Sequence, residues 1–143
     1  MSAMEVEDTL AYLAGTWTLT RAIVDHRSGS SGSFDGVARV HTLGRRGRYE
    51  EQGRLRFGGY DGSARRALEL VVLDARGVAV LFADGRPFFH LDLVTGTCQA
   101  VHRCSLDRYE LEFGASSPDL LLERWRVRGP EKDYEAQTTW RRS

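Results

Sequence analysis

Lysine is almost missing from this 143-residue sequence, in which nineteen of the twenty basic residues are arginine and only Lys132 is lysine. Because a guanidinium stays protonated in proteins, the arginines are expected to bind anions rather than act as bases, and Lys132 alone could form a Schiff base. No charge of one sign dominates either, since 20 basic residues face 20 acidic ones. We therefore expect no nucleic-acid partner, because nucleic-acid binding depends on a basic surface.

Cysteine is also scarce, and long apolar runs are absent. Cys98 and Cys104 fall on one face of one strand, about 20 Å apart at ~3.3 Å per residue, which is too far for a disulfide, so we expect free thiols. No stretch approaches the ~18–20 apolar residues of a membrane span. Residues 1–8 show no signal-peptide pattern. These absences predict a cytoplasmic protein with no membrane partner.

Composition and turn spacing together predict one all-β domain over residues 1–143. Hydrophobic residues make up 41% of the chain and aromatic residues 10%, which suffices for a closed core. From residue 15 onward, alternating apolar segments are interrupted by a turn rich in Gly, Ser or Asp roughly every ten residues. This pattern indicates about eight to ten antiparallel strands in a closed meander barrel over 15–143, because closure removes exposed strand edges.

A short helix is expected before the barrel, over residues 5–14. Val6, Leu10 and Leu13 recur at helical spacing and form one apolar stripe. Gly15 ends the pattern. The N-terminal segment is therefore predicted to pack against the barrel through this stripe.

Charged residues occupy four positions that strand alternation assigns to an inward, otherwise apolar face. These are Arg21, Glu51, Arg66 and His102. An unpaired charge inside a protein costs several kcal/mol, so each must pair with another charge, with water or with a ligand. Four such residues on four different strands predict a polar site inside the barrel.

Gly15-x-Trp17 follows the expected helix and opens the first strand, which resembles the Gly-x-Trp signature of the calycin superfamily, including lipocalins and fatty-acid-binding proteins. The resemblance implies that Arg141 or Arg142, in the last strand, packs near Trp17. A longer pattern is similar to a bacterial and fungal family of single-domain lipocalin-like proteins of unknown function, and implies a small barrel with a polar-lined cavity. Its main segments are Phe34-x-Gly36-x-Ala38, Tyr49-x-Glu51-x-Gly53, Phe82-x-Asp84-Gly85-Arg86, His102-x-Cys104 and Trp125-x-Val127.

The inward Arg21, Glu51 and Arg66 support two interpretations. A carboxylate between two guanidinium groups stays ionised and serves as a rigid anchor, and any arginine left unpaired would clamp a carboxylate or enolate of a ligand. The alternative is a structural salt-bridge network that closes the barrel. The sequence leaves both open.

His90 and His102 are candidates for acid–base chemistry, because imidazole titrates near neutral pH. Cys104 lies two residues after His102 and is either a nucleophile, which would need a third group to orient the pair, or a packing residue. With Asp92 they have the residue types of a metal site. Their spacing matches no close-set site, so we expect no metal and no other cofactor.

Residues at turns and aromatic positions complete the predicted site. Arg86, in an Asp-Gly turn, and Lys132, near the last turn, could both lie over the barrel mouth. Trp17, Tyr49 and Trp125 either fill the core or form walls that suit a flat ligand.

These features lead to the hypothesis of a small-molecule-binding barrel that is a cofactor-independent cyclase, isomerase or lyase of specialised metabolism. Its substrate would be apolar with an acidic or enolic group. The predicted catalytic residues are His102, Glu51 and Tyr109. The predicted ligand-binding residues are Arg21, Arg66, Trp17, Tyr49, Arg86, His90, Trp125 and Lys132. A non-catalytic carrier and a haem-binding barrel are the alternatives, and a homodimer is an assembly that the sequence allows.

Overall fold

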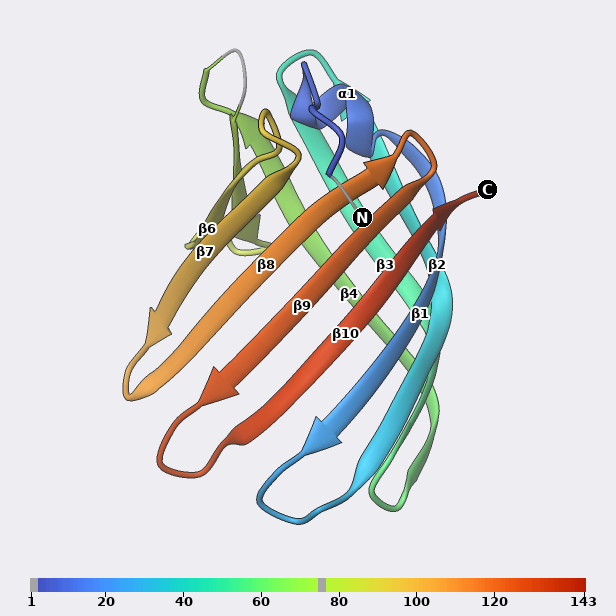
Figure 1. The fold of residues 1–143 in the computed structure, drawn as a ribbon, viewed down its shortest axis with the longest axis vertical. Helices are drawn as coiled ribbons and strands as arrows, with labels where there is room; N and C mark the ends of the chain where they lie inside the picture. The colour runs from blue at the N-terminus through green and yellow to red at the C-terminus, as the bar shows by residue number, and fades with distance from the viewer. Residues whose placement is uncertain (1–2, 75–76) are drawn as a thin grey trace.

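The computed structural model describes residues 3–74 and 77–143, which form ten strands and one short helix (Figure 1). The helix is α1 (Thr9–Leu13), and the strands are β1 (Gly15–Asp25), β2 (Ser31–Leu43), β3 (Arg46–Phe57), β4 (Tyr60–Val72), β5 (Gly77–Phe82), β6 (Pro87–Asp92), β7 (Thr97–Cys104), β8 (Asp107–Ser117), β9 (Leu120–Arg128) and β10 (Asp133–Arg142). No helix in this described part is long and apolar enough to span a bilayer. The prediction of an all-β fold is confirmed.

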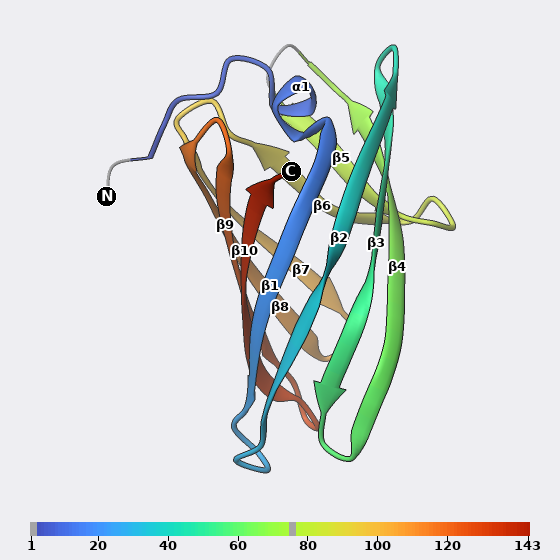
Figure 2. The ribbon, with the colours of Figure 1, turned by 90° about the vertical axis from the view of Figure 1, so that its right-hand side faces the viewer.

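The strands form one antiparallel sheet in the order β6-β5-β4-β3-β2-β1-β10-β9-β8-β7. Consecutive strands lie side by side as in a meander, and the pairing of β1 with β10 joins the two halves of the chain. The sheet curls into a barrel (Figure 2). Its interior is filled by apolar side chains, among which Trp17, Leu19, Leu111 and Leu121 are almost completely buried.

The barrel wall has a seam between β6 and β7, the two edge strands of the sheet. Among the described residues no backbone ladder joins these strands, and the Cys98 thiol instead lies 3.7 Å from the carbonyl oxygen of His90. Aromatic packing closes the seam, where the ring centroids of Phe88 and His102 are 5.1 Å apart. The predicted barrel is therefore nearly closed, with side chains completing the wall.

Helix α1 is shorter than the expected range of 5–14. It begins after Asp8, whose Oδ1 accepts a hydrogen bond from the Ala11 N–H at 3.1 Å. Asp8 is thus the N-cap rather than a residue of the first turn. Val6 is buried as predicted, but it precedes the helix, and its N–H donates to the Leu93 carbonyl.

The packing of Trp17 beneath α1 agrees with the Gly-x-Trp resemblance. Trp17 is fully buried, and its Nε1 donates to the Leu13 carbonyl at 2.9 Å. The guanidinium carbon of Arg142 lies 4.1 Å from the Trp17 ring centroid, and its two Nη atoms donate to the carbonyls of Tyr12 and Ala14. Arg142, not Arg141, therefore fastens the helix to the barrel by hydrogen bonds and a cation–π contact.

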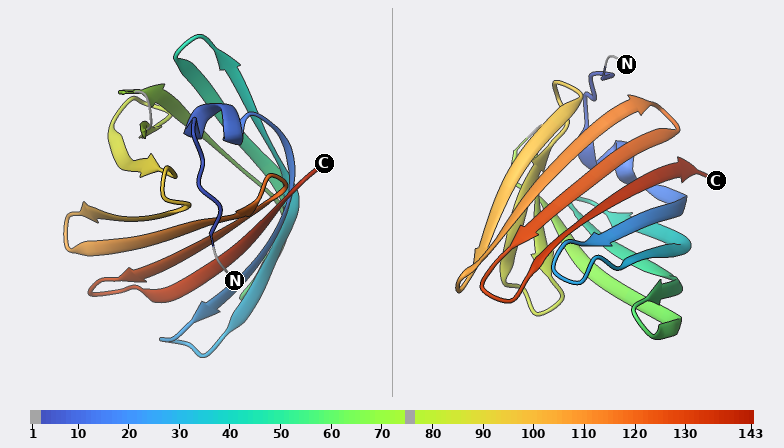
Figure 3. Two further views of the ribbon diagram at one scale, coloured as in Figure 1. Left: turned by 45° about the horizontal axis from the view of Figure 1, so that its top comes forward. Right: turned by 60° about the horizontal axis from the view of Figure 1, so that its bottom comes forward.

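The two ends of the barrel differ. Helix α1 lies across one end (Figure 3), which we call the α1 end, whereas the β1–β2, β3–β4, β7–β8 and β9–β10 turns gather at the far end (Figure 1). Strand β4 pairs with the short β5 only through Leu68–Val72. Residues 60–67 of β4, toward the far end, therefore have no partner in β5.

Candidate functional site

Three charged side chains meet inside the barrel, each from a different strand. Arg21 lies on β1, Glu51 on β3 and Arg66 on β4, and strand alternation turns all three inward as predicted. Glu51 stands directly opposite Arg66 in the β3–β4 ladder. Arg21 reaches across the intervening β2, with its guanidinium carbon 4.9 Å from the Phe34 ring centroid.

Glu51 accepts four hydrogen bonds from three side chains among the described residues. Its Oε2 accepts from Arg21 Nη1 at 2.9 Å and its Oε1 from Arg21 Nη2 at 3.1 Å, which makes a bidentate pair. Oε1 also accepts from Arg66 Nη2 at 3.1 Å and from the Tyr49 hydroxyl at 2.5 Å. Arg21 is fixed in turn, because its Nε donates to Thr138 Oγ1 at 2.8 Å.

This environment keeps Glu51 ionised. Burial would raise the pKa of the carboxyl, but the hydrogen bonds from Arg21 and the charge of Arg66 outweigh burial and lower the pKa of Glu51 to about 2. Burial and the charge of Glu51 raise the pKa of Tyr49 well above its ordinary value. A carboxylate with so low a pKa is a weak base near neutral pH, so the geometry gives Glu51 the part of an anchor.

Among the described residues, Arg66 hydrogen bonds through only one of its three nitrogens. Its Nη2 pairs with Glu51, whereas its buried Nε finds no hydrogen-bond partner among the described residues. The guanidinium carbon lies 4.9 Å from the ring centroid of Trp125 and 5.9 Å from that of Tyr49. Because buried polar groups nearly always have a partner, the Nε–H of Arg66 calls for an acceptor from water or a ligand.

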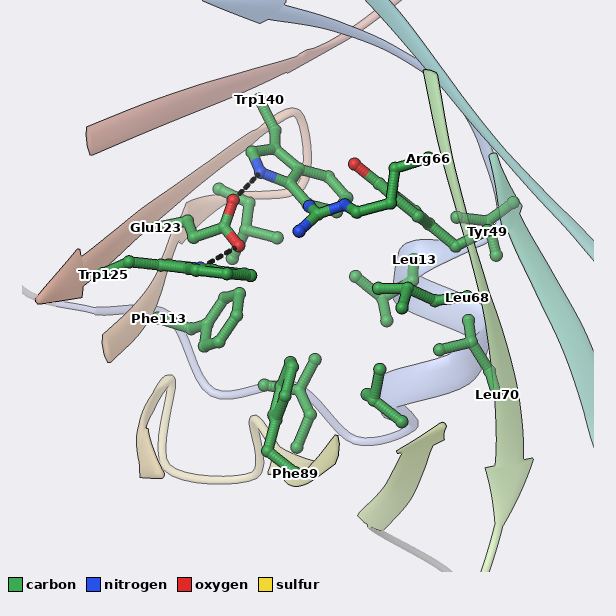
Figure 4. A pocket seen from close by; sticks show the side chains of 14 residues that line it. Leu13, Tyr49, Arg66, Leu68, Leu70, Phe89, Phe113, Glu123, Trp125 and Trp140 are labelled. Carbon is green, nitrogen blue, oxygen red and sulfur yellow. Dashed lines mark hydrogen bonds between the residues drawn. The ribbon is translucent and has the colours of Figure 1, made fainter. Parts of the chain in front are cut away.

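A second buried carboxylate, Glu123 on β9, is absent from the predicted site residues. It is only 5% exposed, and its Oε2 accepts from Trp125 Nε1 at 2.7 Å while its Oε1 accepts from Trp140 Nε1 at 3.0 Å (Figure 4). The sequence does carry the signal for it. Leu121, Glu123 and Trp125 share one alternation phase, so an inward Trp125 implies an inward Glu123.

Two cavities adjoin Arg66 and Trp125, which line both of them. The first, here called the apolar chamber, lies toward the α1 end and has a volume of about 30 Å³, which is room for one or two water molecules. Besides Arg66 and Glu123, its lining is aliphatic and aromatic and includes Leu13, Val40, Leu68, Leu70, Phe113 and Trp140 (Figure 4). The second, here called the polar pocket, has a volume of about 150 Å³ and is lined by Arg21, Ile23, Arg66, Trp125, Tyr134, Ala136 and Thr138.

Lys132 lies at the far end of the barrel, close to the polar pocket. Its Nζ is 3.0 Å from Asp107 Oδ2 and donates to the Tyr109 hydroxyl at 3.3 Å. Burial and the neighbouring Tyr109 raise the pKa of Tyr134, which lines that pocket. The hydrogen bonds to Asp107 and Tyr109 raise the pKa of Lys132, which keeps it charged and unsuited to Schiff-base formation.

His102 lies at the seam, apart from Glu51. Its ring centroid is 5.1 Å from that of Phe88 and 5.7 Å from that of Tyr109, both edge-on. The Tyr109 ring is also 6.3 Å from the ring of Trp125. The structure thus brings together two of the predicted catalytic residues, His102 and Tyr109, and places the third among the arginines.

Four residues predicted to bind ligand line neither cavity, and Lys132 is one of them. His90 is exposed on β6, because the preceding Phe89 is the residue that turns into the apolar chamber. Arg86 is exposed at the β5–β6 turn, where its Nε donates to Asp84 Oδ2 at 2.7 Å. Trp17 packs under α1 and lines neither cavity.

The cysteines are both free, and only one faces the barrel. Cys98 is half-buried, and burial raises the pKa of its thiol. Cys104 is exposed at the end of β7, so it does not pack in the core as the alternation with His102 suggested. Within residues 3–74 and 77–143, no three His, Cys, Asp or Glu side chains are grouped as a metal site would require.

Comparison with known proteins defines the family. The model of a family of unknown function, DUF6314, matches residues 13–142. The chain belongs to DUF6314. Among solved structures, the S-type phycobiliprotein lyase CPES from Guillardia theta is similar to this DUF6314 protein, with a TM-score of 0.72 and 12% sequence identity over 98% of this chain and 93% of that chain. At this identity the likeness shows the shared barrel fold alone. The comparison with curated proteins gives no match.

Proposed function

We propose that this DUF6314 protein binds a small, flat, largely apolar ligand and recognises it through an acidic or enolic oxygen. The observation that carries the proposal is the buried Nε–H of Arg66, which has no partner among the described residues and lies where the two cavities meet. Trp125, which lines both cavities, offers an apolar aromatic wall. A ligand oxygen would accept from Arg66 while the ligand body fills the polar pocket.

The fixed charges favour binding at Arg66 over binding at Arg21. Among the described residues, Arg21 uses three donors to bind Glu51 and Thr138, whereas Arg66 makes one hydrogen bond, to Glu51. Glu51 neutralises part of the charge of the two arginines. Packing against Trp125 fixes the position of the Arg66 donors that Glu51 does not use. Pre-positioned donors bind a ligand at low entropic cost.

A titration of paired variants tests this function. Arg66 faces inward and its neighbour Arg65 faces outward on the same strand, so Arg66→Met removes the donor and Arg65→Met is the matched control. We expect isothermal titration calorimetry with 2-quinolone and naphthalene-2-carboxylate to show binding to wild type and Arg65→Met. Affinity for at least one probe should fall by about tenfold or more in Arg66→Met. Equal affinity in all three proteins, or binding of neither probe, would contradict the proposal.

Catalysis is a second candidate, favoured by the placement of His102 and Tyr109. The Tyr109 hydroxyl accepts from Lys132 and the His102 ring adjoins it, so a proton could be exchanged beside a bound ligand in a cyclase, isomerase or lyase reaction without a cofactor. His102→Gln should reduce turnover of an extracted metabolite, followed by mass spectrometry, by ~10²–10⁴-fold. Cys104→Ser is the control and should retain turnover. Wild-type turnover in His102→Gln would contradict the catalytic role and leave ligand binding as the proposed function.

A further inference from the structure

Glu123 is a carboxylate with hydrogen-bonding capacity left over. Each of its oxygens accepts one indole N–H, from Trp125 and from Trp140. An ionised carboxylate has about four acceptor positions, so each oxygen keeps one that the described residues do not fill. The two indoles also fix its orientation, and both it and they line the apolar chamber.

Arg66 presents the complementary group to the same space. Figure 4 shows the guanidinium of Arg66 and the carboxylate of Glu123 pointing into one cavity from opposite walls. Leucine, valine and phenylalanine side chains surround them. A free donor and a carboxylate with free acceptor positions therefore face each other in a mostly apolar space, where an unmet polar group is costly.

This pairing discriminates between kinds of ligand oxygen. A carboxylate would satisfy Arg66 but would bring a second negative charge close to Glu123, and like charges repel strongly in a buried site. A neutral group that places a donor beside its acceptor oxygen would satisfy both residues. A site built for a donor rejects an analogue that lacks it, because the acceptor of the site is then left unpaired.

We propose that Glu123 is the specificity-determining residue of this barrel, and that it selects ligands whose polar edge pairs a carbonyl oxygen with an adjacent N–H or O–H. Lactams and enolised dicarbonyl compounds have such an edge. The oxygen accepts from Arg66 and the donor hydrogen bonds to Glu123, while the ring body rests on Trp125 in the polar pocket. This inference rests on the proposed function, since it requires binding at Arg66.

Three two-ring probes test the inference by calorimetry at pH 7. 2-Quinolone carries the C=O and N–H pair, 1-methyl-2-quinolone lacks the donor, and naphthalene-2-carboxylate carries a charge instead. Wild type should bind 2-quinolone at least about tenfold more tightly than either other probe. In Glu123→Gln the advantage over the methylated probe should shrink to about threefold or less, and the carboxylate should bind about tenfold more tightly than to wild type. The exposed carboxylate Glu112 on β8 supplies the control, because Glu112→Gln should change none of these ratios.

The decisive result is that Glu123→Gln lowers the preference for 2-quinolone while it raises the affinity for naphthalene-2-carboxylate. If Glu123 only held the two tryptophans in place, its replacement would lower the affinity for all three probes alike. Equal loss of all three in Glu123→Gln would therefore overturn the inference. If that variant does not fold, the wild-type ratios decide. Equal affinity for the three probes, with binding still lost in Arg66→Met, overturns the selection by Glu123 and leaves the proposed function standing. Failure of every probe to bind overturns both.

Discussion

Glu51 and Glu123 are two buried carboxylates on opposite walls of one barrel, and they are satisfied in different ways. Each is 5% exposed. Glu51 accepts four hydrogen bonds, three of them from the charged Arg21 and Arg66. Glu123 accepts two, both from neutral indoles. The charge of Glu51 is met by two guanidinium groups of the chain, which links strands, whereas Glu123 faces only neutral donors and keeps an acceptor position on each oxygen, which is the condition for binding something else.

Arg66 connects the two carboxylates. It is paired with Glu51 through Nη2, stacked against Trp125, and left with an unpartnered Nε. Its position is therefore fixed by the structural site while its free donor belongs to the cavity. A rigid support with one open donor is what pre-organised recognition requires.

The largest expected effect separates Glu51 from its exposed neighbour. Glu51→Gln leaves Arg21 and Arg66 without a counter-charge inside the barrel, so the free energy of unfolding should fall by about 3–5 kcal/mol. Glu50→Gln on the outer face of β3, where Glu50 pairs with the exposed Arg48, should change it by no more than about 1 kcal/mol. Urea unfolding of both variants checks this, and a Glu51→Gln protein as stable as Glu50→Gln would refute the structural role.

The second prediction concerns the pH dependence of the same carboxylate. The pKa of Glu51 falls from 4.5 to about 2 on folding, so its contribution is present above pH 4.5 and is lost as the pH falls from 4.5 through 2. Between pH 6 and pH 3 wild type should lose about 2 kcal/mol more stability than Glu51→Gln, because only wild type has this carboxyl to protonate. A stability difference that stays constant over this range would show that Glu51 has an ordinary pKa.

The smallest of these effects concerns Glu123. Glu123→Gln keeps one acceptor oxygen for the indoles and leaves no buried guanidinium without its partner, so the loss of stability should be about 1–2 kcal/mol. Thermal or urea unfolding measures it beside Glu51→Gln. A loss as large as that of Glu51→Gln would mean that both carboxylates are structural and would remove the distinction between them.

Strand alternation predicts a large part of this arrangement from the sequence. The inward faces of β1, β3 and β4 are regular, so Arg21, Glu51 and Arg66 are correctly assigned to the interior. Their convergence follows from the meander order, which the turn spacing also predicts. The sequence could not predict which arginine hydrogen bonds through all three nitrogens and which keeps an unpartnered Nε. That depends on the reach of Arg21 across β2 to Glu51 and Thr138.

Other assignments fail for local reasons. The β5–β6 ladder places Phe89 opposite the buried Val80, so Phe89 rather than His90 turns inward. The alternation of buried and exposed side chains on β7 stops before the strand ends. Cys104, its last residue, is therefore exposed although His102 two residues earlier is half-buried. Helix α1 is shorter than the apolar stripe suggests because Asp8 caps it. Val6 is buried in the segment before the helix, where its N–H donates to the Leu93 carbonyl.

The central claim, that the Nε–H of Arg66 is a free donor kept for a ligand, is tested most directly by nitrogen–proton NMR of the arginine side chains. Arg66→Met identifies the Arg66 Nε signal, and the Nε signal of Arg21, bonded to Thr138, serves as the internal reference. On addition of 2-quinolone the Arg66 Nε–H resonance should move downfield and exchange more slowly with water, while that of Arg21 stays in place. An Arg66 signal that does not respond to a probe that binds, or a response at Arg21 instead, would contradict the account.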